Sequence, residues 1–256
     1  MSGKTARPFF SYYGSKWTGA KHYGPPRSNL VIEPFAGSAC YATRWSCENV
    51  RLYDVSEDIC DLWDFLINCS ESDITSIPDS FEGMEQVSKL SRGQSLLVRF
   101  WIAKGRADPS GTLSPWYLKW RSSTDCRVWG RSVKKRVVEQ KPMISKWSID
   151  CMSWEKIPLI EAHWHVDPPY NNSAGSRYPN SSINFESLGE WCRALPGHVD
   201  VCENVGAEWL DFVPLYEVVS SRGRRSGHKS KEAVWRKKLP CTTSTQPPAY
   251  PAWTLS

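Results

Sequence analysis

The chain has 256 residues, with 32 Lys and Arg against 27 Asp and Glu, and a formal net charge of +5. Hydrophobic residues make up 40% and charged residues 23%, proportions that exclude a wholly disordered chain and favour an ordinary globular one. No run of eighteen apolar residues occurs, which excludes a membrane-spanning helix, and no secretory signal precedes the first strand. We therefore expect a cytoplasmic protein.

The cysteine pattern argues against a disulfide scaffold and against a structural zinc site. The nine cysteines are odd in number, and no CxxC pair occurs among them. Reduced thiols are the expectation for such a chain. The 14 tryptophans could stack on nucleobases where they alternate with cations, or they could simply fill the core.

The first 69 residues show a strand–helix rhythm. Residues 30–35, LVIEPF, predict a buried strand, followed by a turn of small residues and a helix. Residues 51–55 predict a second strand that ends in an acid, and residues 57–70 have helical periodicity. This order predicts a parallel α/β sheet with right-handed crossovers.

Between residues 70 and 152 the rhythm changes. Residues 81–103 look helical, with a weak point at Gly93, and residues 105–130 form a loop rich in Gly, Pro and Ser. A basic helix follows and stops at Pro142. We therefore predict an inserted, mainly helical subdomain over 70–152.

From residue 153 the α/β rhythm resumes. A strand runs into the sequence DPPY, a helix and a further strand follow, and residues 215–237 predict two strands joined by a basic loop. Residues 153–239 then form the second part of the core. The Pro- and Thr-rich segment 240–256 is expected to be a disordered tail.

The first chemical signal is the turn Ile32–Cys40, IEPFAGSAC, which follows a strand and opens a helix. Small residues there let a nucleotide-like ligand approach the backbone. A single glycine is not a GxGxxG fingerprint, so NAD and FAD are not expected. The alternative is a tight turn that binds nothing.

The second signal is Asp54, at the end of the second predicted strand. A carboxylate at that end of a parallel sheet can accept hydrogen bonds from both hydroxyls of a ribose. The alternative is a solvated acid that caps the next helix.

The third signal is Asp167-Pro168-Pro169-Tyr170, directly after the apolar strand. The prolines make a rigid turn and leave carbonyls without local donors. A carboxylate and a carbonyl held together can accept both hydrogens of an exocyclic amine, and the tyrosine can stack on the ring that bears it. The neighbouring pattern His163-x-His165-x-Asp167 resembles a metal site, but nothing nearby completes one, so we expect the histidines to pack and no metal to bind.

The order YxGSK, EPFAGS, strand-end Asp, insert and DPPY resembles the Dam-like (D12 class) DNA adenine methyltransferases, many of them phage-encoded. The resemblance spans roughly residues 8–238, with Ala39 standing where many relatives have a second glycine. It implies a Rossmann-like S-adenosylmethionine-dependent core with a mixed, mostly parallel sheet and an inserted helical target-recognition subdomain. The implied cofactor residues are Tyr13, Gly14, Lys16, Glu33, Pro34, Phe35, Ala36, Gly37, Ser38, Asp54 and Asp167.

The resemblance also implies a reaction, the transfer of a methyl group to the 6-amino group of an adenine flipped out of duplex DNA. The implied catalytic residues are Asp167, Pro168, Pro169 and Tyr170. A catalytically silent DNA-binding protein on the same fold, or amino-methylation of cytosine or RNA, are the alternatives.

Cations interleaved with aromatic residues are the expected DNA contacts, because Lys and Arg neutralise phosphates. The alternative is a solvated face over a core rich in tryptophan. Double-stranded DNA is the expected partner, with the chain a monomer or weak dimer. The candidate DNA-binding residues are Arg99, Lys104, Arg121, Arg127, Arg131 and Lys134 in the insert, and Arg222, Arg224 and Arg225 in the basic loop.

Overall fold

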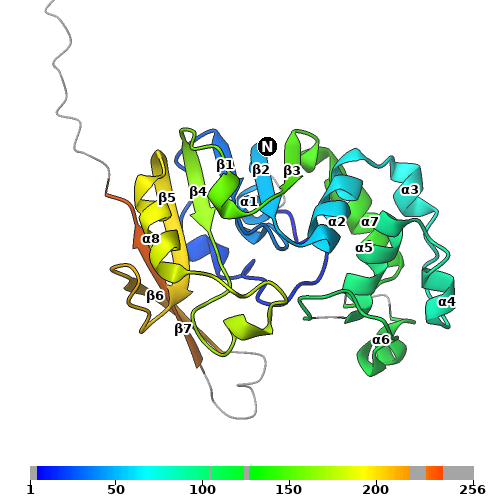
Figure 1. The fold of residues 1–256 in the computed structure, drawn as a ribbon. Helices are drawn as coiled ribbons and strands as arrows, with labels where there is room; N and C mark the ends of the chain where they lie inside the picture. The colour runs from blue at the N-terminus through cyan, green and yellow to red at the C-terminus, as the bar shows by residue number, and fades with distance from the viewer. Residues whose placement is uncertain (1–4, 104, 124–126, 220–228, 239–256) are drawn as a thin grey trace, which may run out of the picture.

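The computed structural model describes residues 5–103, 105–123, 127–219 and 229–238. Seven strands form one sheet in the order β3-β2-β1-β4-β5-β7-β6 (Figure 1). The first five in that order are parallel, whereas β7 runs antiparallel to both β5 and β6. The strands are β1 Leu30–Glu33, β2 Asn49–Asp54, β3 Trp147–Cys151, β4 Ala162–Val166, β5 Gly197–Asn204, β6 Val213–Val219 and β7 Lys229–Arg236.

This topology confirms the expected α/β class, a Rossmann-like core with a mixed, mostly parallel sheet. The strand order reverses between β1 and β4: β2 and β3 extend from one side of β1, and β5 extends from the far side of β4. In such sheets, ligands bind outside the carboxyl ends of the strands at the point of reversal.

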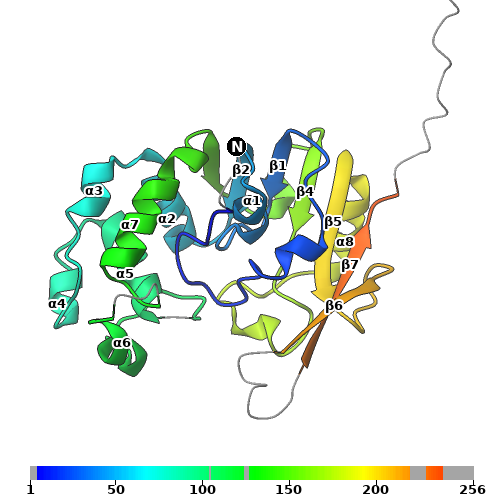
Figure 2. The ribbon, with the colours of Figure 1, turned by 180° about the vertical axis from the view of Figure 1, so that it is seen from behind.

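Helices cover both faces of the sheet. Helix α8 lies in front of β5 in Figure 1, and α1 lies in front of the sheet in the reverse view of Figure 2. The helices are α1 Cys40–Trp45, α2 Glu57–Asn68, α3 Glu71–Thr75, α4 Met84–Val87, α5 Arg92–Ala103, α6 Pro115–Trp120, α7 Arg131–Gln140 and α8 Phe185–Ala194. Short 3-10 turns are η1 Ala20–His22, η2 Lys141–Ile144, η3 Trp154–Lys156 and η4 Gly175–Arg177.

The central strand β4 is buried along its whole length, as expected of a parallel strand covered on both faces. Two hydrophobic clusters form the core. The larger contains Trp63 and Trp129, and the smaller contains Trp164. These three tryptophans are fully buried, so they fill the core and are not available to stack on nucleobases.

Helices α3 to α7 lie together beyond the β3 edge of the sheet (Figures 1 and 2). Helix α5 packs on α2 through Gly93, where a Cβ atom would lie 2.3 Å from the ring of Phe65. The glycine that we read as a weak point therefore permits a close helix–helix contact. The helix predicted over 81–103 is broken, because α4 ends at Val87 and α5 begins at Arg92.

One boundary of the predicted insert needs correction. Residues Trp147–Cys151, which we placed within a helical segment, form the edge strand β3, whose Cys151 pairs in register with Asp54 of β2. The strand is five residues long and half-exposed, so its hydrophobic pattern was too short to reveal it. That residues 70–152 act as a separate recognition unit stays a prediction.

In the ranges given above, every helix is too short or too polar to cross a bilayer. The segment 240–256, predicted as a tail, lies outside the described residues.

Candidate functional site

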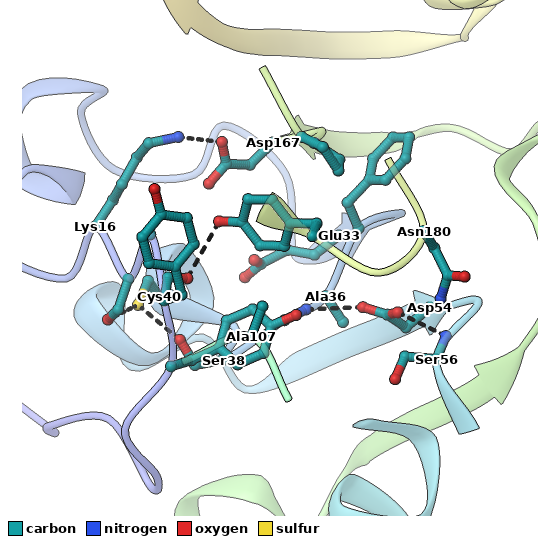
Figure 3. A pocket seen from close by; sticks show the side chains of 18 of the residues that line it. Lys16, Glu33, Ala36, Ser38, Cys40, Asp54, Ser56, Ala107, Asp167 and Asn180 are labelled. Carbon is teal, nitrogen blue, oxygen red and sulfur yellow. Dashed lines mark hydrogen bonds and ion pairs between the residues drawn. The ribbon is translucent and has the colours of Figure 1, made fainter. Parts of the chain in front are cut away.

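A cavity of about 320 Å³ opens at the carboxyl ends of β1, β2 and β4, at the point where the strand order reverses. This volume lies within the range of small-molecule sites. Figure 3 shows Lys16 and Asp167 on one side of it and Asp54 on another. The predicted residues that line it are Tyr13, Gly14, Lys16, Glu33, Phe35, Ala36, Gly37, Ser38, Asp54, Asp167 and Pro169.

Three predicted site residues do not line the cavity. Pro34 and Pro168 are buried, since they lie within the turns that shape its wall. Tyr170 is half-buried and lies behind Lys16, whose Nζ is 4.1 Å from the centroid of the tyrosine ring. Pro34 is not among the residues that line the cavity, and the cofactor contact predicted for it stays a prediction.

The β1–α1 turn needs small residues for steric reasons. Gly37 has φ +43°, and a Cβ atom there would lie 2.9 Å from the ring of Tyr12. Ala39 also adopts a left-handed conformation, with φ 45° and ψ 52°. Such a conformation costs an alanine about 1–2 kcal/mol, so the turn is strained at the position where many Dam-like enzymes have glycine.

Asp54 is held by this turn. Its Oδ2 accepts a hydrogen bond from the backbone N–H of Gly37 at 3.0 Å, and its Oδ1 accepts one from the N–H of Ser56 at 2.9 Å. Burial raises the pKa of Asp54, and these backbone donors oppose the rise. Each oxygen keeps a second lone pair, so the carboxylate can still accept two adjacent hydroxyl groups.

Glu33, at the end of β1, is a buried carboxyl group with only 3% of its surface exposed. Its Oε1 accepts a hydrogen bond from the backbone N–H of Ala42 at 2.8 Å. The pKa of Glu33 is raised to about 8, mainly by burial; the Ala42 donor opposes the rise and the nearby Asp167 adds to it. Among the described residues no cation pairs with Glu33, so the cavity holds a site suited to an ammonium group.

Lys16 and Asp167 form an ion pair on one side of the cavity, although they lie 151 positions apart in the chain (Figure 3). Their side chains are 15% and 26% exposed. Burial alone lowers the pKa of Lys16, but the Asp167 carboxylate outweighs it and the net pKa is raised. Burial raises the pKa of Asp167, and Lys16 opposes that rise. The pair keeps Lys16 charged and close to the DPPY turn.

The two histidines of β4 pack against Tyr41. The ring of Tyr41 stacks on His163 and on His165, with centroids 5.2 and 4.2 Å apart. Burial is the main cause that lowers the pKa of His163 to about 4 and that of His165 well below its ordinary value. Both rings are therefore neutral at pH 7. Within the described ranges, no group of three or more His, Cys, Asp or Glu has the geometry of a metal site.

The sequence did not reveal the loop that closes the cavity from the DPPY side. Tyr178, Pro179 and Asn180 line the cavity, and Asn180 lies beside Asp54 in Figure 3. The hydroxyl of Tyr178 donates to the backbone O of Tyr13 at 3.1 Å, over Gly14, where a Cβ atom would lie 2.0 Å from that hydroxyl. The loop follows DPPY directly at the same strand end. That position in the sequence was the signal that could have indicated its place at the cavity.

Other residues that line the cavity also went unrecognised. They include Tyr12, Ser15, Cys40, Ala107 and Trp154. Cys40 lies 3.0 Å from the hydroxyl of Ser15, and burial raises the pKa of its thiol. Tyr12 and Ser15 belong to the YxGSK motif and Cys40 ends the IEPFAGSAC turn, so these motifs were the available clue. Ala107 and Trp154 belong to no such motif, and only the folded chain brings them to the cavity.

The candidate DNA-binding cations differ in the exposure of their side chains and in the contacts that they already make. The side chain of Arg131 is 88% exposed, and its Nε lies 3.4 Å from Asp79. Lys134 is only 15% exposed and is held by the Asp79 carboxylate and the backbone O of Ile77, each 2.7 Å away. Lys134 therefore stabilises the fold, and a DNA phosphate would have to displace it from Asp79 and Ile77.

The remaining cations are partly engaged or lie outside the described residues. Arg121 donates to the backbone O of Phe81 at 3.1 Å and pairs with Glu82 at 2.7 Å. Arg127 lies over the ring of Trp120, 4.3 Å from its centroid, and Arg99 is half-buried. DNA contact by any of them stays a prediction. Those outside the described residues are Lys104, Arg222, Arg224 and Arg225.

Comparisons with known proteins add little to this picture. No protein-family model matches the chain, and no curated protein matches it. One solved structure that matches is "Putative methyltransferase yhhF from Escherichia coli", at 8% identity and a TM-score of 0.32, over 82% of this chain and 76% of that one. So low an identity and TM-score do not indicate a shared activity.

Proposed function

We propose that the chain transfers a methyl group from S-adenosylmethionine to the 6-amino group of adenine in double-stranded DNA. The observation that carries the proposal is one cavity that holds Lys16, Glu33, Asp54 and Asp167 at the strand ends where the sheet order reverses. These four ionisable groups come from four separate segments of the chain, and each matches a different part of the proposed reactants.

The charged groups of the cavity fit the cofactor. Lys16 suits a carboxylate, the unpaired Glu33 carboxyl suits an ammonium group, and Asp54 suits the two hydroxyls of a ribose. The left-handed Gly37, which lines the cavity, lets the ring of Tyr12 pack closely against the β1–α1 turn. The bound cofactor would supply a sulfonium methyl group that is already reactive.

The residues of the chain then supply acceptors and position. Asp167 and the carbonyl of Pro168 would accept the two hydrogens of the adenine amino group, which shifts lone-pair density toward the transferred methyl. Such catalysis rests mainly on orientation and electrostatics. Lys16 must first leave Asp167, because its ammonium group pairs with that carboxylate and covers the ring of Tyr170.

Duplex DNA as substrate is the part of the proposal that rests on the motif order and on the cations of the insert. Helix α6 ends at Trp120 and helix α7 begins at the exposed Arg131, and both helices lie beyond the sheet edge. Arg127, which lies over the Trp120 ring, is in the segment between them. Basic side chains beside aromatic rings suit a phosphate backbone and exposed bases.

The test is direct. The purified protein is incubated with labelled S-adenosylmethionine and unmodified genomic DNA, the DNA is digested to nucleosides, and the labelled nucleoside is identified by mass spectrometry. An Asp167→Ala variant serves as the inactive control, and Asp150→Asn, an exchange on the exposed end of β3, serves as the matched active control.

Labelled N6-methyladenine, absent with Asp167→Ala, supports the proposal. Label on cytosine would keep the site chemistry and overturn the base assignment. No label on DNA, with cofactor binding shown by calorimetry, would overturn DNA as the substrate. Absence of cofactor binding would overturn the proposal as a whole.

A further inference from the structure

The side chain of Tyr170 is held at its backbone end and at its hydroxyl group. Its ring follows the DPP turn at the end of β4 and faces the ammonium group of Lys16. Its hydroxyl donates a hydrogen bond to Oε2 of Glu232 at 2.5 Å. Glu232 lies on β7, 62 residues further along the chain, and is only 5% exposed.

Glu232 is itself held in place by neutral donors. Its Oε1 accepts from the hydroxyl of Ser230 at 2.8 Å and from Nδ2 of Asn204 at 3.5 Å. The register of β5 and β7 sets Asn204 opposite Glu232. In the described part of the chain, no Lys, Arg or His forms an ion pair with Glu232. A buried acid without a counterion is costly, which makes its strong hydrogen bond to Tyr170 significant.

The tyrosine keeps its proton and so acts as the donor. Burial raises the pKa of Tyr170 well above its ordinary value, and Tyr23, Asp167 and Glu232 raise it further. A hydrogen bond from a neutral hydroxyl to a carboxylate is about twice as strong as one between neutral groups. The bond therefore fixes the position of the hydroxyl end of the ring relative to the β5–β7 strand pair.

We propose that Glu232 is a positioning residue, which holds the Tyr170 ring in the place where the acceptor base stacks on it. This inference rests on the proposed function and assigns a residue from β7 to the same site. Stacking on an aromatic ring contributes only while the ring keeps its orientation, and a tyrosine held only at its backbone end could rotate when Lys16 leaves. Glu232 touches neither the cofactor nor the base, so it acts through Tyr170.

The experiment uses the full-length protein and four variants: Glu232→Ala, Glu232→Gln, Tyr170→Phe and the Glu232→Ala/Tyr170→Phe double variant. Methylation kinetics give kcat and KM for DNA, and calorimetry gives the Kd for S-adenosylmethionine. Glu217→Ala is the matched control, because Glu217 is an exposed acid on the adjacent strand β6.

Glu232→Ala is expected to lower kcat/KM for DNA by roughly 10- to 100-fold, the loss of one hydrogen bond to a charged group. The Kd for S-adenosylmethionine should stay within about twofold of the wild-type value, since Glu232 does not line the cavity. Glu232→Gln keeps an acceptor and should recover most of the loss. Tyr170→Phe should resemble Glu232→Ala, and the double variant should be no worse than either.

A spectroscopic readout separates positioning from general damage. DNA that carries 2-aminopurine at a mapped methylation site becomes fluorescent when that base leaves the helix, and stacking on Tyr170 quenches it. Glu232→Ala should flip the base and quench it less than wild type. Thermal unfolding reports folding, and if Glu232→Ala does not fold, Glu232→Gln and Tyr170→Phe decide the question.

Wild-type kcat/KM in both Glu232→Ala and Tyr170→Phe would overturn the inference, as would additive losses in the double variant. A wild-type protein that methylates no DNA would instead overturn the proposed function, and with it this role of Glu232. The two failures are distinguishable because the first requires an active wild type.

Discussion

Exchanging Glu33 for glutamine should stabilise the protein, and more so as the pH rises. Glu33 is buried at the end of β1, and Ala42 is its only hydrogen-bond donor in the described residues. Glutamine has almost the same shape and keeps the Oε1 acceptor for that N–H. The exchange therefore removes the cost of a buried ionisable group while it retains the packing.

The size of the effect follows from the displaced ionisation. Burial moves the pKa of Glu33 from 4.5 to about 8, whereas the unfolded chain keeps the ordinary value. Between these pH values the folded protein binds a proton that the unfolded chain has lost, so wild-type stability falls as the pH rises. Each pH unit corresponds to about 1.4 kcal/mol, which gives an upper limit of about 5 kcal/mol at pH 8 and above.

Urea unfolding of wild type and Glu33→Gln from pH 4 to pH 9 measures this difference. The two proteins should be close in stability below pH 4.5, diverge up to about pH 8 and stay parallel beyond it. Glu190→Gln, an exposed position on α8, is the matched control and should follow wild type at every pH. A gap that is constant with pH, or that shrinks as the pH rises, would refute the reasoning.

The same exchange, Glu33→Gln, should weaken binding of the cofactor. Glutamine cannot pair with an ammonium group, so calorimetry should show a higher Kd for S-adenosylmethionine in the stabilised variant. Below pH 8, binding to wild type should release a proton, which appears as a dependence of the measured heat on the buffer's own ionisation enthalpy. Glu33→Gln should lack that dependence.

Four further exchanges test the site and the insert. Asp167→Ala should reduce methylation by at least about 100-fold while cofactor binding persists, since it removes an acceptor for the reacting amine; near-normal turnover would sink that role. Lys16→Met should raise the Kd for S-adenosylmethionine by roughly 10- to 100-fold, as measured by calorimetry, through loss of a charged donor. Arg131→Glu should weaken DNA binding and flatten its salt dependence without changing thermal unfolding, and an unchanged salt slope would place the DNA elsewhere. Lys134→Met should instead destabilise the fold by about 1–3 kcal/mol, because it removes the donor to the carbonyls of Thr75 and Ile77 and leaves Asp79 with the exposed Arg131; an unchanged melting temperature would contradict this.

Much of the core and of the cavity could be predicted because the relevant signals are local. A strand followed by small residues, an acid at a strand end and the rigid DPPY turn each specify a strand end by themselves. The carboxyl ends of parallel strands meet at one edge of the sheet, so Gly37, Asp54 and Asp167 had to lie near one another once the parallel order was inferred. The strand order in the structure agrees with that inference.

The tertiary structure decided everything that depends on pairs of residues far apart in the chain. The hydrogen bond between Tyr170 and Glu232 and the contact of Tyr178 over Gly14 join segments whose spacing follows no repeat. Lys134 looked like any other surface cation until the fold brought Asp79 to it. Composition and periodicity report which face of an element is buried, but a side chain's partner is determined by how loops and strands pack in three dimensions.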